Sequence, residues 1–279
     1  MTTNAPLVSV RGATKTFRRS ALIPGSAAKG VRALDGVSID IPRGGTIGLV
    51  GESGSGKSTL GRCILRLVEL DAGTIHWHEP DGRSSSIHEM DTRTLRAHRR
   101  RMQVVFQDPY HSLNPARPVW QIVGESLFIA GGVRAEEIRD RAAALLGSVG
   151  LDTSCLDRLP HAFSGGQRQR IAIARALAVE PEFLVCDEVT SALDTRTQAQ
   201  VLDLLRELQA RLGLTLLFIS HDLHTVAAMS TRVAVMHAGR IVEEGEPERI
   251  FSEPTDAYTR ALVAALPDPD PRRRTFRAS

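Results

Sequence analysis

The sequence predicts an α/β fold in which short buried strands alternate with helices and one helical block is inserted. Apolar runs of strand length recur along the chain, at 47–50, 183–186 and 216–219, and a helical pattern separates the last two. From Pro109 to about Val179 helical periodicity dominates and strand patterns are few. Because alternating strands and helices favour one α/β core, we expect that core to carry a helical subdomain at about 108–180.

Local patterns predict the remaining elements. Alternating apolar and polar residues predict further strands at 7–11 and 37–41. Strands are also expected at 73–77 and in the short apolar run 102–106, and a hairpin with arms 233–236 and 240–243 is expected around Ala238-Gly239. Helical spacing predicts helices at 94–101, 136–149, 166–178 and 199–212. Residues 18–30 and 78–86 are mostly polar or small and contain proline and glycine, so we expect loops there. We expect the tail after Leu266 to be mobile.

The composition is ordinary for a globular protein. Of 279 residues, 42% are hydrophobic and 24% are charged, and the formal net charge of +3 is too small to indicate a nucleic-acid partner. No apolar run approaches the about 18–20 residues of a membrane-spanning helix, and no secretory signal opens the chain. A partner would therefore have to bring this protein to a membrane. Cys63, Cys155 and Cys186 lack metal-site spacing and are expected to be reduced, packed thiols.

A glycine-rich motif follows the strand predicted at 47–50. Residues 51–58 fit the P-loop pattern G-x-x-x-x-G-K-[ST], and apolar residues then recur on one face of a helix. The glycines let several backbone N–H groups point at one anion, and the helix N-terminus adds its positive dipole end. Lys57 would reach the β- and γ-phosphates of a nucleotide, and the Ser58 hydroxyl would hold Mg²⁺. The alternative is a glycine-rich turn with an accidental lysine, which the strand–loop–helix context disfavours.

Two adjacent carboxylates, Asp187 and Glu188, follow the apolar strand at 183–186. A carboxylate at the tip of a buried strand beside a P-loop can hold Mg²⁺ through water, and its neighbour can polarise an attacking water. The pair alone is weak evidence of catalysis, and the P-loop upstream strengthens it.

A second anion-binding helix start is predicted at Ser164-Gly165-Gly166-Gln167. Ser164 is a natural N-cap, and the two glycines expose backbone N–H groups. Taken alone, this stretch is explained at least as well by a simple capped helix.

Together these motifs resemble those of ABC-type ATPases, over about residues 7–250. Ser164–Gln167 resembles the signature motif, and the strand ending in Asp187-Glu188 resembles Walker B. The other matches are Phe17 with the adenine-stacking aromatic residue, Gln107 with the Q-loop glutamine, Ser191–Asp194 with the D-loop and His221 with the switch histidine. The resemblance implies a P-loop NTPase core of the ABC ATPase type, with an antiparallel β subdomain and an inserted helical subdomain. It predicts an ATPase domain at 1–250 and a C-terminal tail at 251–279.

Three stretches narrow the resemblance to the dipeptide, oligopeptide and nickel importer branch. They are Phe106–Pro109, Ser112–Pro115 and the tail motif Asp256–Leu262. Val189 departs from the proline that commonly follows the Walker B glutamate, and we expect this change to be tolerated. The cysteine cluster that some members carry after the tail motif is absent, which predicts no iron–sulfur cluster.

The resemblance implies a role for each motif, with ATP and Mg²⁺ bound between two subunits. Phe17 would stack on adenine, and the phosphates would be bound by Gly51, Glu52, Ser53, Gly54, Ser55, Gly56, Lys57, Ser58 and Thr59. Mg²⁺ would be held by Ser58, Gln107 and Asp187. Glu188 would be the general base, with His221 and Gln107 completing the catalytic set. ATP bound to the partner would be contacted by Ser164, Gly165, Gly166 and Gln167.

The implied function is ATP hydrolysis coupled to peptide import, with nickel or another chelated metal as the alternative cargo. The implied partners are two membrane permeases, a second and non-identical ATPase subunit and, indirectly, a solute-binding protein, at the cytoplasmic face of the membrane. Nucleic acid is not among them, and a homodimer is the alternative assembly. We expect the permeases to dock near 107–130, with Tyr110, Pro115 and Trp120 as exposed anchors.

Three other classes fit less well. The tail motif disfavours the ATPase of an exporter. A soluble ABC ATPase of DNA repair or translation usually has coiled coils or two cassettes, and this chain has neither. Intact Lys57, Glu188 and His221 disfavour a degenerate, structural cassette.

Overall fold

The computed structural model describes residues 6–17, 30–108, 112–130 and 134–266. The segment 18–29 of the expected loop, Tyr110 and the tail after Leu266 lie outside these ranges. Within them, no helix is both long and apolar enough to cross a bilayer.

The larger sheet has six strands in the order β10-β9-β3-β8-β7-β6. They are β3 (Thr46–Val50), β6 (Met102–Val105), β7 (Phe183–Asp187), β8 (Thr215–Ser220), β9 (Arg232–His237) and β10 (Arg240–Gly245). Five strands run parallel, and β10 pairs antiparallel with β9 as the predicted hairpin. Every residue of β3, β7 and β8 is buried, which is why these strands have continuous apolar sequences rather than alternating ones.

A second sheet is antiparallel, in the order β2-β1-β4-β5. Its strands are β1 (Pro6–Phe17), β2 (Val31–Pro42), β4 (Ala72–His78) and β5 (Ser84–Ser86). The loop expected at 78–86 is therefore wrong in part, because Ser84–Ser86 pairs with His76–His78. A run of three serines has no apolar pattern, so only the pairing with β4 defines this strand. Together the two sheets confirm the predicted fold class.

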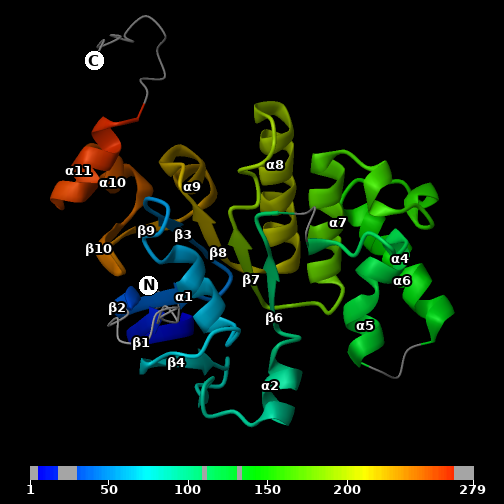
Figure 1. The fold of residues 1–279 in the computed structure, drawn as a ribbon, viewed down its shortest axis with the longest axis horizontal. Coiled ribbons are helices and arrows are strands. Elements are labelled where there is room, and N and C mark those ends of the chain that lie inside the picture. Colours follow the sequence, from blue (N-terminus) through cyan, green and yellow to red (C-terminus); the bar gives the residue numbers. More distant parts are fainter. Residues whose placement is uncertain (1–5, 18–29, 109–111, 131–133, 267–279) are drawn as a thin grey trace, which may run out of the picture.

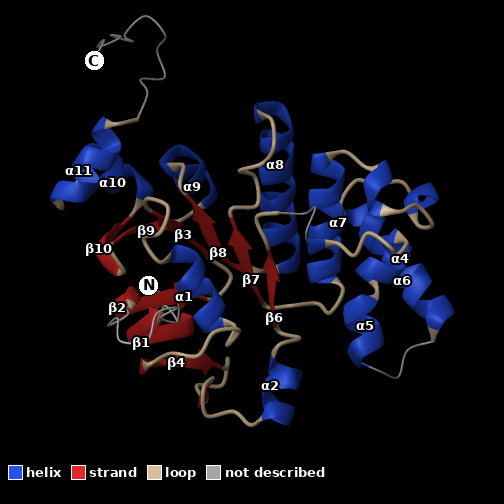
Figure 2. Ribbon diagram, viewed as in Figure 1, coloured by secondary structure: helices blue, strands red, loops and turns tan. Residues whose placement is uncertain are grey.

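Helices cover both faces of the larger sheet (Figure 2). α8 (Thr195–Leu212) and α9 (Leu223–Met229) pack on one face with Leu184 and Cys186, while α1 (Lys57–Ile64) and the antiparallel sheet pack on the other with Phe183 and Val185. Asp194 caps the N-terminus of α8, and Gly213 ends it in the left-handed conformation. A further helix, α2 (Thr92–His98), precedes β6.

Residues 119–177 contain helices and, in their described part, no strand. The elements are α4 (Val119–Val123), α5 (Glu125–Ala130), α6 (Ala135–Ser148), the short 3₁₀ turns η1 (Thr153–Cys155) and η2 (Pro160–Ala162), and α7 (Gly165–Leu177). Figure 1 shows this group beside β6 and β7, with α7 next to the sheet. α7 packs on β6 and α8, so it joins this helical segment to the core.

Two short helices follow β10: α10 (Pro247–Ser252) and α11 (Ala257–Ala264). Local periodicity did not predict them, because each spans at most about two turns and packs on the β9–β10 hairpin.

The three cysteines are buried free thiols. Burial raises the pKa of Cys63 to about 11 and that of Cys186 to about 12, which keeps both protonated.

Candidate functional site

The P-loop connects β3 to α1 by a path that only glycine can follow. Gly51 has φ 153° and Gly56 has φ 109°. A Cβ on Gly51 would lie 2.0 Å from the Met236 carbonyl oxygen, and one on Gly56 would lie 2.2 Å from that of Ala33. The loop therefore packs directly against the backbones of β9 and β2.

Lys57 folds back over this loop. Its Nζ donates hydrogen bonds to the carbonyl oxygens of Gly51, at 2.7 Å, and Glu52, at 2.8 Å. Lys57 is only 4% exposed, and burial lowers the pKa of its ammonium against the opposing effect of Glu188, Asp187 and Glu52. Among the described residues, the partners of this ammonium are carbonyl and hydroxyl oxygens, so it is suited to an incoming anion.

Ser58 and Asp187 meet where α1 begins and β7 ends. The Ser58 hydroxyl donates to Asp187 Oδ1 at 2.7 Å. Burial raises the pKa of Asp187, and the bond from Ser58 and the charge of Arg62 act in the opposite direction. These oxygen donors have the chemistry that Mg²⁺ prefers. Among the described residues no cluster of three or more His, Cys, Asp or Glu side chains could hold a metal alone.

Glu188 directly follows β7 in a left-handed conformation, with φ 50°. Its N–H donates to the carbonyl of Ile219 on β8, so a sheet-like contact holds this uncommon backbone in place. The His221 imidazole lies beside it, with Nδ1 3.6 Å from Glu188 Oε2. Val189, at the position where proline was expected, is buried and packs in the core.

Most of these side chains border one cavity of about 420 Å³. Phe17 lies at its edge with 44% of its surface exposed, and Lys15 Nζ is 5.8 Å from the ring centroid. The cavity is lined by Phe17, Val31, Ala33, Ser53, Gly54, Gly56, Lys57, Ser58, Thr59, Gln107 and Glu188. Asp187 and His221 do not line it, but they contact Ser58 and Glu188, which do. The structure thus brings residues of β1, the P-loop and the segments that follow β6 and β7 to one cavity.

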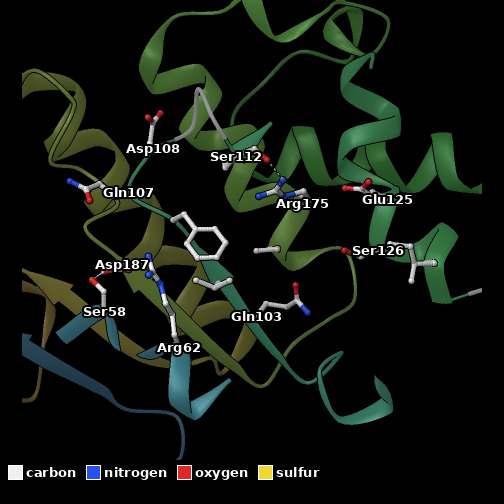
Figure 3. A pocket seen from close by; sticks show the side chains of 14 residues that line it. Ser58, Arg62, Gln103, Gln107, Asp108, Ser112, Glu125, Ser126, Arg175 and Asp187 are labelled. Atoms are coloured by element: carbon white, nitrogen blue, oxygen red, sulfur yellow. Dashed lines mark hydrogen bonds between the residues drawn. The ribbon is translucent and has the colours of Figure 1, made fainter. Parts of the chain in front are cut away.

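A second cleft, of about 640 Å³, opens beside the first and extends to the helical segment (Figure 3). Ser58, Gln107 and Asp187 border it on one side, and Glu125, Ser126 and Ile129 of α5 on the other. Gln107 lines both cavities, so it lies between the P-loop and α5.

Two arginines in this second cleft were not identified from the sequence. Arg62 extends from α1 toward Asp187, and Arg175 donates to the Ser112 carbonyl (Figure 3). Neither belongs to a recognisable motif. Only the arrangement of the chain brings them to the cleft.

The Ser164 segment lies apart from the cavity beside the P-loop. None of Ser164, Gly165, Gly166 and Gln167 lines that cavity. Ser164 caps α7 in a full capping box, with Gln167 N–H donating to Ser164 Oγ at 3.3 Å and Gln167 Oε1 accepting from Ser164 N–H at 3.0 Å. Gly166 is required by packing, because a Cβ there would lie 2.2 Å from the Thr197 side chain.

The expectation that Trp120 is an exposed anchor is wrong. Its ring is half-buried against the core of the helical segment, and the Arg139 guanidinium lies 5.8 Å from its centroid. Pro115 is exposed. Among the described residues of 107–130, the large exposed apolar side chains are Phe128, at 75%, and Ile129, at 59%.

Comparisons with known proteins identify the family. The ABC transporter family matches residues 34–191. A Brucella ovis protein is 50% identical over 277 residues, 99% of this chain and 83% of its own. The dipeptide transport ATP-binding protein DppF of Escherichia coli K12 is 47% identical over 251 residues, 89% of this chain and 74% of that protein.

A solved structure shows the same fold. The dimeric ATP-binding cassette MJ0796, in a post-hydrolysis state bound to ADP and Pi, superposes with a TM-score of 0.73 at 29% identity, covering 86% of this chain and 98% of that one. The chain therefore belongs to the ABC transporter family, as its ATP-binding cassette. Membership implies ATP binding and hydrolysis as part of a transport complex.

Proposed function

We propose that this chain is the ATP-hydrolysing subunit of an ABC importer that takes up peptides. The observation that carries the ATPase part is the convergence of Lys57, Ser58, Gln107 and Glu188 on one cavity. The peptide part rests on relatives whose names are dipeptide and oligopeptide transport ATP-binding proteins, at 47% and 46% identity. The tail motif at 256–262 agrees with that branch.

Nucleotide binding follows from the shape and charge of the cavity. Phe17 would stack on adenine, and residues 51–59 would surround the triphosphate, with the Lys57 ammonium and the N–H groups at the start of α1 directed at it. Lys57 would exchange carbonyl partners for phosphate oxygens, which bind an ammonium more strongly because they are charged.

Ser58, Gln107 and Asp187 would hold Mg²⁺ together with phosphate oxygens and water. When bound, Mg²⁺ would neutralise charge on the phosphates during transfer. The raised pKa of Asp187 reflects a buried carboxylate that a divalent cation would stabilise in its ionised form.

Glu188 would accept the proton of the water that attacks the γ-phosphate. The left-handed backbone at Glu188 would keep its carboxylate at the cavity while β7 remains in the sheet. His221 lies close enough to orient Glu188 or to contact the γ-phosphate. Gln107 borders both cavities, so its position would couple nucleotide binding to the shape of the neighbouring cleft.

A second subunit would complete the site. The Ser164 segment is an anion-binding helix start that does not border its own nucleotide cavity, so its ligand would be the ATP of a facing subunit. MJ0796 was solved as a dimer with nucleotide, which supports this arrangement. We propose that the partner is a related but different ATPase subunit. Ser164→Arg should then abolish closure at only one of the two ATP sites. A fully active transporter that contains two copies of this chain and no other ATPase would contradict a non-identical partner.

The permeases would dock on α5 and the cleft beside Gln107. Phe128 and Ile129 offer exposed apolar surface there, and Gln107 connects this surface to the nucleotide cavity. Such docking would place the chain at the cytoplasmic face of the membrane.

One reconstitution tests the proposed function. Proteoliposomes would contain this chain, the permeases and ATPase encoded by neighbouring genes and the solute-binding protein, with ATP on the side of this chain. Labelled peptide uptake that stops in Glu188→Gln is expected. Uptake of a nickel chelate without peptide would favour the alternative cargo, and ATP hydrolysis without uptake of either would contradict the importer.

A further inference from the structure

We propose that the C-terminal helix α11 holds the P-loop through Tyr258, and that this contact sets the affinity for ATP. The inference rests on the proposed nucleotide site. Tyr258 would be a positioning residue, because it contacts the P-loop backbone and does not line the nucleotide cavity.

The contact joins positions 206 residues apart. The Tyr258 hydroxyl accepts a hydrogen bond of 3.0 Å from the N–H of Glu52, the second residue of the P-loop. The Tyr258 ring stacks on His237 at the end of β9, with centroids 4.0 Å apart and planes inclined by 26°. The stacking directs the hydroxyl at the loop.

Lys57 holds the same peptide group from its other end. The peptide between Gly51 and Glu52 has its oxygen on Gly51 and its N–H on Glu52. Lys57 Nζ donates to that oxygen at 2.7 Å, while Tyr258 accepts from that N–H. The two contacts together fix the plane of this peptide and, with it, the position from which Lys57 would reach phosphate.

α11 is itself anchored to the hairpin strand β10. The buried Glu243 carboxylate accepts from the N–H and hydroxyl of Thr255, both at 2.8 Å, and from the N–H of Asp256 at 3.0 Å. Asp256 then caps α11 by accepting from the N–H of Tyr258 at 2.8 Å. A continuous chain of contacts thus runs from β10 through the α11 cap to the P-loop.

The hairpin makes a second, independent contact with the loop. The N–H of Gly239 donates to the Ser55 carbonyl at 2.9 Å. This contact keeps the loop folded when Tyr258 is changed. Removing the Tyr258 hydroxyl should therefore alter the orientation of one peptide, not the whole motif.

Tyr258→Phe tests the proposal, because it removes the hydroxyl and keeps the ring on His237. We expect the Kd and KM for MgATP to rise about threefold to tenfold, the loss of one neutral hydrogen bond, with kcat within about twofold. Ala261→Ser, an exposed change on the same helix, is the matched control and should leave Kd and KM unchanged. Wild-type affinities in Tyr258→Phe would overturn the proposal.

Glu243→Gln provides a test at a distance. Weakening the α11 anchor should raise the Kd for MgATP in the wild-type background. It should have little further effect in Tyr258→Phe, because both changes interrupt the same chain of contacts from β10 to the P-loop. Additive effects of the two changes would contradict this path.

Hydrogen exchange of the wild-type chain keeps the proposal testable if a variant fails to fold. ATP should slow amide exchange in residues 257–264, because if α11 strengthens ATP binding, ATP binding must stabilise α11 to the same extent. Unchanged exchange there, with ATP bound, would overturn the proposal. Failure of the wild-type chain to bind ATP would instead overturn the proposed nucleotide site.

Discussion

The Ser58 hydroxyl donates a 2.7 Å hydrogen bond to Asp187, and this contact joins the first turn of α1 to the end of β7. The two residues are 129 positions apart in the chain. Their pairing places two of the candidate Mg²⁺ ligands side by side.

Asp187→Asn keeps an oxygen that can accept from Ser58 and removes the negative charge. Mg²⁺ should then support ATP binding about tenfold to a hundredfold less effectively, because the charge that attracts the cation is gone. A titration of Mg²⁺ at fixed ATP measures this directly. The same Mg²⁺ midpoint in variant and wild type would show that Asp187 does not serve the metal.

Glu188→Gln should keep ATP binding and reduce turnover by roughly 10²–10⁴-fold, because the amide cannot accept the proton of the attacking water. The shape of the side chain is retained, so the bound state should be preserved. Steady-state hydrolysis and equilibrium ATP binding together check the prediction. Turnover within twofold of wild type would show that Glu188 is not the general base.

Lys57→Ala should weaken ATP binding by about tenfold or more, the loss of a charge-assisted hydrogen bond to phosphate. The change also leaves the Gly51 and Glu52 carbonyls without their ammonium donor. Calorimetric titration measures the affinity, and the urea midpoint checks that the fold persists. An unchanged affinity in a folded variant would contradict the role of Lys57.

Phe128→Ser should weaken assembly with the permeases while ATP binding persists. Phe128 is 75% exposed, so its loss should not cost core packing in the isolated subunit. Trp120→Ala is the contrasting variant, because its half-buried ring supports the helical segment and its loss should lower stability as well. Co-purification with the permeases is the measurement, and full retention of Phe128→Ser would refute docking on α5.

Glu243 should make the stability of the C-terminal region depend on acid pH. Burial acts to raise the pKa of its carboxyl, but the hydrogen bonds that it accepts from Thr255 and Asp256 outweigh burial and lower the pKa from 4.5 to about 2. A lowered pKa in the folded state means that this stabilisation is present above pH about 4.5 and is lost as the pH falls toward about 2.

Urea midpoints of wild type and Glu243→Gln measure this dependence. Wild type should be more stable at pH 7, and the difference should shrink as the pH falls below about 4.5. A difference that stays constant from pH 7 to pH 3 would contradict it.

Local sequence determined the parts of this protein whose chemistry is contiguous. The P-loop could be predicted because its strand, glycines and helix follow one another within 46–64, and each has its own pattern. Asp187 could be placed at a strand end for the same reason. The capping box of Ser164 and Gln167 spans three positions and is likewise a local property.

Tertiary structure decided the relationships between distant segments. The bond from Glu52 to Tyr258 and the shared position of Gln107 between two cavities have no local signature, because they depend on how α11, α5 and α7 pack around the sheet. Likewise, periodicity indicates only that a residue such as Trp120 is apolar. Whether its ring faces solvent depends on the neighbouring helix, which here supplies Arg139 to cover it.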